Sequence, residues 1–227
     1  MPHSRDVRTH ASEIKFVVST ELAARIRQWA RTHLDPDPHG SGRFGDEYQT
    51  TSIYFDTGGL DVFHRRGSFG RSKYRIRRYG TAQVAFLERK MRQPSVLAKR
   101  RTLASLTALD RLGTAELDGA WEGHWFHRRL VARGLQPVCQ VTYQRVARVL
   151  VHGGETIRLT LDANLEAQPS KRIGFAHPAG VPFLHDRVIL ELKFRGVVPA
   201  TFRRLVEELM LNPEPASKYR MGLAAYA

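Results

Sequence analysis

The segment Lys73-Tyr74-Arg75-Ile76-Arg77 places a cation at every second position and an apolar residue between each pair. Side chains two apart on a β-strand share a face, so the segment predicts a strand with one cationic and one apolar face. Charged residues at alternate positions recur in three other segments, which are Glu13-Ile14-Lys15, Glu88-Arg89-Lys90 and Glu191-Leu192-Lys193-Phe194-Arg195. In Arg158-Leu159-Thr160-Leu161-Asp162 the two charges are four apart, with Thr160 between them on the same face. An ordinary half-buried strand has this pattern too, with its charges in water. The repetition, and the predominance of Lys and Arg, favour a sheet whose charged faces share one interior.

The chain has 227 residues, of which 42% are hydrophobic, enough for one domain with a sizeable core. Its charge is unusual, because 36 Lys and Arg residues stand against 22 Asp and Glu residues, a formal net charge of +14. A strongly basic protein attracts anionic partners, such as phosphates, nucleic acid or an acidic membrane surface. We see neither an aromatic stacking platform nor a recognition-helix motif, so we expect no specific nucleic-acid partner.

Three features predict a cytoplasmic protein. The single Cys139 excludes an internal disulfide framework and fits a reducing compartment. No stretch approaches the roughly 20 apolar residues of a membrane span, and residues 1–10 lack the apolar core of a signal peptide. A membrane-protein partner encoded elsewhere stays compatible with these features.

The chain is expected to form a flexible N-terminal tail, residues 1–11, and one α+β domain, residues 12–227. Patterns of β-forming residues predict about eight strands, over residues 13–18, 49–56, 71–79, 82–92, around Lys99, 138–152, 156–165 and 188–194. The strands at residues 71–79 and 82–92 are expected to form a hairpin that turns near Gly80. Helices are predicted over residues 21–33, capped by Ser19 or Thr20, within 105–133, and over 200–211, with the end of the chain read as a tail.

A closed barrel of eight strands would explain why each strand has one apolar face and one charged face. Its apolar residues would pack outward beneath the helices at 21–33 and 200–211: Ile14, Phe16, Tyr74, Ile76, Leu159, Leu161, Leu190, Leu192 and Phe194. Its charged residues would line a lumen, where charges persist only if they are paired, hydrated or neutralised by a ligand. An excess of cations there would suit a polyanion such as polyphosphate.

Eight motifs occur in an order typical of one family: Glu13-Ile14-Lys15-Phe16, Ser52-Ile53-Tyr54-Phe55-Asp56-Thr57, Lys73-Tyr74-Arg75-Ile76-Arg77-Arg78-Tyr79-Gly80, Phe86-Leu87-Glu88-Arg89-Lys90, Tyr143-Gln144-Arg145, Arg158-Leu159-Thr160-Leu161-Asp162, Leu190-Glu191-Leu192-Lys193 and Ser217-Lys218-Tyr219. This series resembles the VTC domain, the polyphosphate-polymerase branch of the CYTH-like triphosphate tunnel metalloenzymes. The resemblance spans residues 13–219.

The resemblance implies an antiparallel eight-stranded β-barrel with a basic lumen and peripheral helices. It assigns phosphate contacts to nine residues, of which the first six form the catalytic set: Lys15, Arg75, Arg77, Lys90, Arg145, Arg158, Lys99, Tyr143 and Lys218. It also implies that Glu191 binds Mn²⁺ or Mg²⁺. Glu13 and Glu88 are candidates for a base or a second metal carboxylate.

The first motif departs from the wider superfamily, whose signature reads Glu-x-Glu-x-Lys. Here Ala11 stands at the first glutamate position, and Glu13 and Lys15 complete the motif. The VTC branch has this same pattern. The missing carboxylate weighs against a dedicated two-metal hydrolase.

The expected activity is transfer of the γ-phosphate of ATP to a growing inorganic polyphosphate, because phosphoryl transfer depends on positioning and neutralisation of oxygen charge. Hydrolysis of triphosphate or of a nucleoside triphosphate, and binding of polyphosphate without turnover, are the alternatives. Taken alone, each charged residue also has a simpler interpretation: Glu191 as an ion-pair partner of Lys193, Asp162 as a partner of Arg145 or Arg158, and Arg100 and Arg101 as surface charges.

Overall fold

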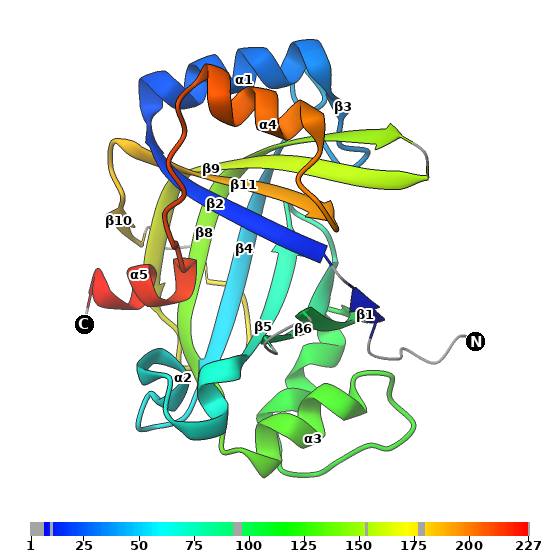
Figure 1. Cartoon of the computed structure of the whole chain (residues 1–227). Helices are drawn as coiled ribbons and strands as arrows, with labels where there is room; N and C mark the ends of the chain where they lie inside the picture. Colours follow the sequence, from blue (N-terminus) through cyan, green and yellow to red (C-terminus); the bar gives the residue numbers. More distant parts are fainter. Residues whose placement is uncertain (1–6, 10, 93–96, 153, 177–179, 227) are drawn as a thin grey trace.

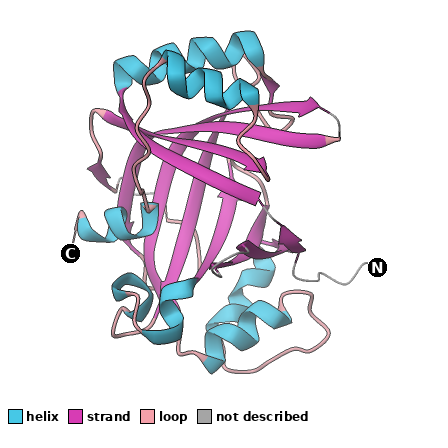
Figure 2. Ribbon diagram, in the orientation of Figure 1, coloured by secondary structure: helices cyan, strands magenta, loops and turns pink. Residues whose placement is uncertain are grey.

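One antiparallel sheet organises the protein, and helices cover parts of it (Figures 1 and 2). The computed structural model describes residues 7–9, 11–92, 97–152, 154–176 and 180–226. Its strands are β1 (Val7–Thr9), β2 (Ala11–Ser19), β3 (Asp35–Pro36), β4 (Glu47–Asp56), β5 (Ser72–Tyr79), β6 (Val84–Arg92), β7 (Leu97–Ser105), β8 (Gln136–His152), β9 (Glu155–Pro169), β10 (Val181–Phe183) and β11 (Arg187–Arg195). Its helices are α1 (Thr20–His33), α2 (Asp61–His64), α3 (His124–Ala132), α4 (Ala200–Glu208) and α5 (Lys218–Ala224), with the 3₁₀-helices η1 (Gly67–Arg71) and η2 (Thr107–Gly113).

The strands follow one hydrogen-bonded path in the order β1-β7-β6-β5-β4-β8-β9-β11-β2, while β10 pairs with β9 and β3 with β8. The described residues therefore contain eleven strands, not the eight predicted. The three additional strands, β1, β3 and β10, are only two or three residues long and depend on distant pairing partners. Val7–Thr9 lies within the segment expected to be a flexible tail, and it pairs with β7.

The sheet curls around an interior without closing into the predicted barrel. Its path ends at β1 and β2, and among the described residues no backbone pairing joins these two strands. β2 crosses in front of the other strands (Figure 1), and its Glu13 forms an ion pair with Lys90 of β6. The two ends of the path are also consecutive in the chain, with residue 10 between them.

The apolar faces of the strands face outward, but only part of the predicted set packs beneath α1 and α4, since Tyr74 and Ile76 belong to another cluster. Under α1 and α4 lies one core cluster, to which the strands contribute Phe16, Leu159, Leu161, Leu190, Leu192 and Phe194. Ile26 of α1 and Phe202 of α4 are fully buried against it, and each such side chain contributes about 1.5–3 kcal/mol. A second cluster contains Tyr74 and Ile76 of β5 together with Phe126 of α3. Figure 1 shows α1 and α4 side by side across one end of the sheet.

Local signals account for several element boundaries. Ser19 caps α1, since its hydroxyl accepts a hydrogen bond from the backbone of Leu22 at 3.2 Å. The predicted hairpin is confirmed, with β5 and β6 in register from Ser72 opposite Met91, and Gly80 adopting a positive φ of 51° in the turn. The region predicted to be helical over residues 105–133 contains only η2 and α3. Within the described residues no helix is long and apolar enough to cross a membrane.

Candidate phosphate-binding interior

Glu191 lies at the centre of a group of lysines inside the curled sheet. It stands opposite Lys15 of β2 in the β11–β2 register. One carboxylate oxygen, Oε1, lies 3.2 Å from Lys15 Nζ and 2.9 Å from Lys218 Nζ, and the other lies 2.9 Å from Lys193 Nζ. Burial alone would raise the pKa of Glu191, but Lys193, Lys218 and Lys15 outweigh it and hold this pKa well below its ordinary value. The carboxylate is therefore ionised and contacts three lysines.

Glu13 links the first strand of the interior to the opposite wall. Its two oxygens lie 3.0 Å from Lys15 Nζ and 3.1 Å from Lys90 Nζ, the latter reaching across from β6. Burial and the nearby Glu191 act to raise the pKa of Glu13, but Lys90, Lys15 and Lys193 lower it to about 2. Lys15 thus joins two carboxylates, which places Glu13 and Glu191 close to one another.

Asp162 anchors Arg145 and the last helix. The Arg145 guanidinium donates two hydrogen bonds to the fully buried Asp162 carboxylate, at 2.6 and 2.7 Å, and a third to the Tyr143 hydroxyl at 3.3 Å. Lys218 Nζ lies 2.6 Å from the same carboxylate while also contacting Glu191. Since Lys218 is the first residue of α5, this cluster fixes the helix against β9 and β11.

Glu88 of β6 gathers a second set of cations. Its Oε2 lies 2.6 Å from Arg75 Nη2, and its Oε1 lies 3.1 Å from both Lys99 Nζ and Arg101 Nε. Burial opposes ionisation, but Arg75 and the other neighbouring cations keep the pKa of Glu88 well below its ordinary value. Arg77, on the same strand face as Arg75, donates to the Ser52 hydroxyl at 2.9 Å instead of to a carboxylate.

Arg158 extends the interior toward α1. It lies on the same face of β9 as Asp162, four residues away. Its Nη2 lies 2.9 Å from a carboxylate oxygen of Asp37 and 2.6 Å from the Tyr48 hydroxyl. All the residues predicted to contact phosphate thus lie on inward faces of the sheet or at the start of α5.

Three cations of this interior were not among the predicted phosphate ligands. Arg101 was expected at the surface with Arg100, but adjacent residues on a strand face opposite sides, and Arg101 reaches Glu88. Lys193 and Lys73 share the inward faces of Glu191 and Arg75, respectively. Alternation had already placed Lys73 and Lys193 on the charged faces, and the same argument from Lys99 could have placed Arg101 there.

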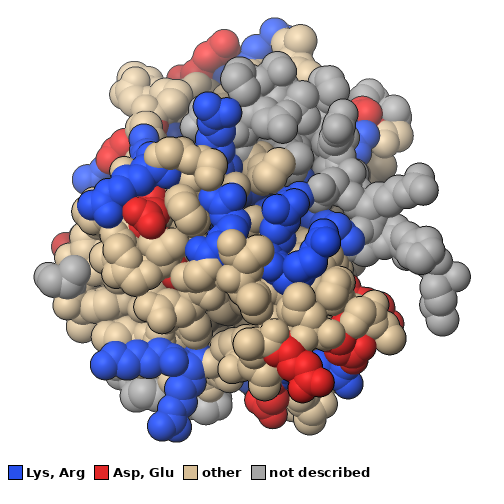
Figure 3. Space-filling view, turned by 90° about the horizontal axis from the view of Figure 1, so that it is seen from below, with Lys and Arg blue, Asp and Glu red and all other residues tan. Residues whose placement is uncertain are grey.

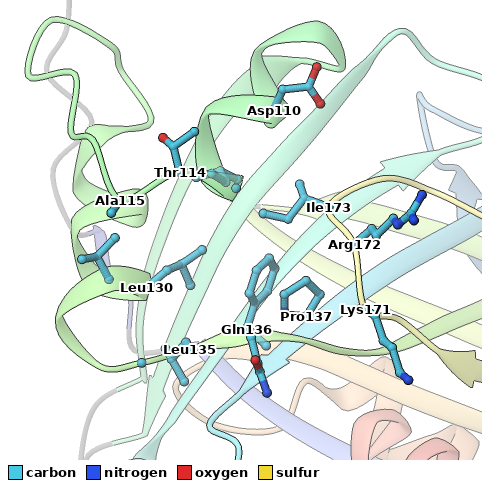
Figure 4. A pocket seen from close by; sticks show the side chains of 15 residues that line it. Asp110, Thr114, Ala115, Leu130, Leu135, Gln136, Pro137, Lys171, Arg172 and Ile173 are labelled. Carbon is cyan, nitrogen blue, oxygen red and sulfur yellow. The ribbon is translucent and has the colours of Figure 1, made fainter.

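The face seen from below carries several Lys and Arg side chains near its middle and others at its edge (Figure 3). By contrast, a cavity of about 590 Å³ lies elsewhere, between η2, α3 and the segment around Ile173 (Figure 4). Apolar side chains such as Leu130 and Pro137 contribute much of its lining, and none of the interior carboxylates borders it.

The carboxylates of the interior should make the fold sensitive to acid. Their pKa values are depressed in the folded protein, so their contribution to stability is complete above the unfolded-state value of 4.5 and is lost as the pH falls. For Glu13 the loss extends from pH 4.5 to about 2 and amounts to about 3 kcal/mol. Thermal unfolding monitored by circular dichroism should show a midpoint that falls steeply across this window. A midpoint that stays constant between about pH 5 and about pH 2.5 would contradict a stabilising role of these ion pairs.

A curled antiparallel sheet whose inward faces carry many cations and a few carboxylates agrees with the tunnel fold that the motif series implied. The chain belongs to the VTC domain family, whose sequence profile matches residues 10–227. No curated protein sequence matches the chain.

Solved structures resemble the fold over nearly its whole length. A candidate adenylate cyclase from Bacillus halodurans superposes with a TM-score of 0.57 at 16% identity, covering 92% of this chain and 95% of its own. A protein from Pyrococcus horikoshii OT3 gives 0.52 at 15% identity, covering 94% and 98%. A conserved hypothetical protein from Pyrococcus furiosus gives 0.50 at 12% identity, covering 93% and 99%. At these identities the likeness concerns the fold alone.

Proposed function

We propose that the protein is a metal-dependent polyphosphate polymerase that transfers the γ-phosphate of ATP to inorganic polyphosphate inside the curled sheet. The observation that carries this proposal is the excess of cations over carboxylates in the interior. Each of Glu13, Glu88, Asp162 and Glu191 already contacts two or more cations. Arg77 and Lys73 donate to serine hydroxyls instead. Such an interior suits a ligand with many negative charges along its length.

The cations would act by positioning and by neutralising oxygen charge. Arginine suits this role because its planar fork binds two phosphate oxygens, whereas lysine supplies a point charge on a flexible stem. We assign phosphate binding to the ligands that family resemblance implied: Lys15, Arg75, Arg77, Lys90, Lys99, Tyr143, Arg145, Arg158 and Lys218. A terminal phosphate of the chain is already anionic, so its attack on ATP needs no strong base.

A divalent cation could bind beside Glu191 only if phosphate oxygens of the substrate complete the coordination shell of the cation. Among the described residues no group of three or more His, Cys, Asp or Glu side chains could hold a metal. Glu191 and Glu13 nevertheless approach one another through Lys15, and Mg²⁺ in proteins is commonly bound by one or two carboxylates plus substrate phosphates. We therefore assign Glu191, with Glu13 as second carboxylate, to hold Mn²⁺ or Mg²⁺, which would neutralise and polarise the transferred phosphoryl group. Glu88 is surrounded by Arg75, Lys99 and Arg101, which favours a positioning role for it.

The test is incubation of the purified protein with ATP and Mn²⁺ or Mg²⁺, followed by separation of ADP, free phosphate and polymer. We expect ADP to appear in step with a growing anionic polymer, and chelation of the metal to stop both. Phosphate release from tripolyphosphate without chain growth would replace the proposal by a hydrolase. If the protein binds polyphosphate but turns over neither ATP nor tripolyphosphate, it is a polyphosphate-binding module and not an enzyme.

A further inference from the structure

Three cations, Lys73, Arg75 and Arg77, follow one another along the inward face of β5. Lys73 is the first of them and the only lysine. It shares its face with Arg75 and Arg77, at intervals of about 6.5 Å along the strand. Its Nζ donates to the Ser217 hydroxyl at 2.8 Å. Ser217 is the N-cap of α5, and its hydroxyl also accepts from the backbone of Arg220.

The charges around Lys73 distinguish it from the other lysines of the interior. Lys15 and Lys218 each bridge two carboxylates, and their pKa values are raised. The charged groups that act most on Lys73 are instead all cations. They face it from β2, β6, β5 and α5 and are Lys15, Lys90, Arg75 and Arg220. Burial and these four cations lower the pKa of Lys73 to about 7.

A purely structural role does not explain this arrangement. A partly buried ammonium among cations costs free energy unless an anion neutralises it. Capping of α5 does not require Lys73, because the Ser217 hydroxyl acts there as acceptor from the Arg220 backbone. The position therefore favours binding of an anion over stability of the protein alone.

We infer that Lys73 and the Ser217 hydroxyl form a phosphate subsite at the end of the β5 row, which holds a phosphate of a chain longer than the triphosphate bound by Arg75 and Arg77. The inference rests on the proposed function and names its substrate class as inorganic polyphosphate longer than tripolyphosphate. Lys73 would supply the charge, and Ser217, which can both donate and accept, would orient a phosphate oxygen.

The test compares binding of tripolyphosphate and of a long polyphosphate by calorimetry. Lys73→Met should weaken long-chain binding about tenfold, the value of one charge-assisted hydrogen bond, and change tripolyphosphate binding less than about twofold. Lys171→Met removes one charge from an exposed site bordering the outer cavity and should affect neither ligand strongly. Lys73→Met should also leave the unfolding midpoint of the free protein equal or higher, whereas a structural lysine would lower it.

The outcomes separate the two proposals. Equal loss of both ligands in Lys73→Met, or no loss at all, would overturn the subsite while polymerase activity stands. Failure of the wild-type protein to bind either ligand would overturn both.

A second measurement uses the charge of Lys73 directly. Because its pKa in the free protein is about 7, long-chain binding requires uptake of a proton as the pH rises above that value. Wild-type affinity for the long chain should therefore fall with pH more steeply than that of Lys73→Arg, whose side chain stays charged. Identical pH profiles for the two proteins would count against the subsite.

Discussion

Glu191→Gln is expected to lower the rate of polymer formation by about 100-fold or more, while polyphosphate still binds. Glutamine keeps the size of the side chain but removes the charge that Lys15, Lys193 and Lys218 contact. Loss of that charge removes the proposed metal ligand and leaves an even more cationic interior. Binding of polyphosphate should therefore become tighter as turnover falls. ADP release and calorimetric binding, measured on the same sample, check both directions.

The matched control is Glu155→Gln at the start of β9, where the carboxylate is half exposed and lies 3.7 Å from Arg195. It removes the same charge from the surface and should retain the wild-type rate. The assignment of Glu191 fails if Glu191→Gln keeps its rate within about tenfold and its response to metal concentration.

Asp162→Asn should cause the largest loss of stability. The mutation removes the charge from a fully buried carboxylate that contacts both Arg145 and Lys218. Breaking one side of a buried ion pair costs about 3–5 kcal/mol, because the remaining charges stay buried without a partner. For a chain of this size the unfolding midpoint should fall by about 10 °C.

Differential scanning calorimetry measures this effect, with Asp110→Asn as control. Asp110 is exposed on η2, so its replacement should leave the midpoint within about 1 °C. A midpoint for Asp162→Asn equal to that of the control would contradict the cluster around Asp162. Added polyphosphate should restore part of the lost stability, because it binds only the folded state.

Alternation along the chain was enough to predict which faces of the long strands are buried. Leu159 and Leu192 pack beneath α1 and α4 as expected, because a side-chain period of two leaves little choice once a strand forms. Tyr74 is buried too, but against α3, because alternation does not predict which helix covers a face. Strand number and closure could not be predicted this way. Short strands such as β3 and β10 have no local signal and exist through pairing with β8 and β9. Whether the edges of a sheet meet depends on accumulated twist, which no single segment encodes.

The site was predictable only in part for a related reason. Family motifs identified Glu191 and Arg145, and the register of neighbouring strands brings Glu191 opposite Lys15. Contacts between distant segments, such as Glu13 with Lys90, depend on how the whole sheet curls. The helix α5 was read as a tail, although it carries Lys218, since its seven residues are too few to show a helical period clearly.

The N-terminal segment, which contains β1 and β2, determines how the curled sheet can widen. It contributes both edge strands, but β2 pairs with β11 over nine positions and β1 with β7 over only three. Any widening of the curled sheet would therefore break the short β1–β7 pairing before the longer β2–β11 pairing.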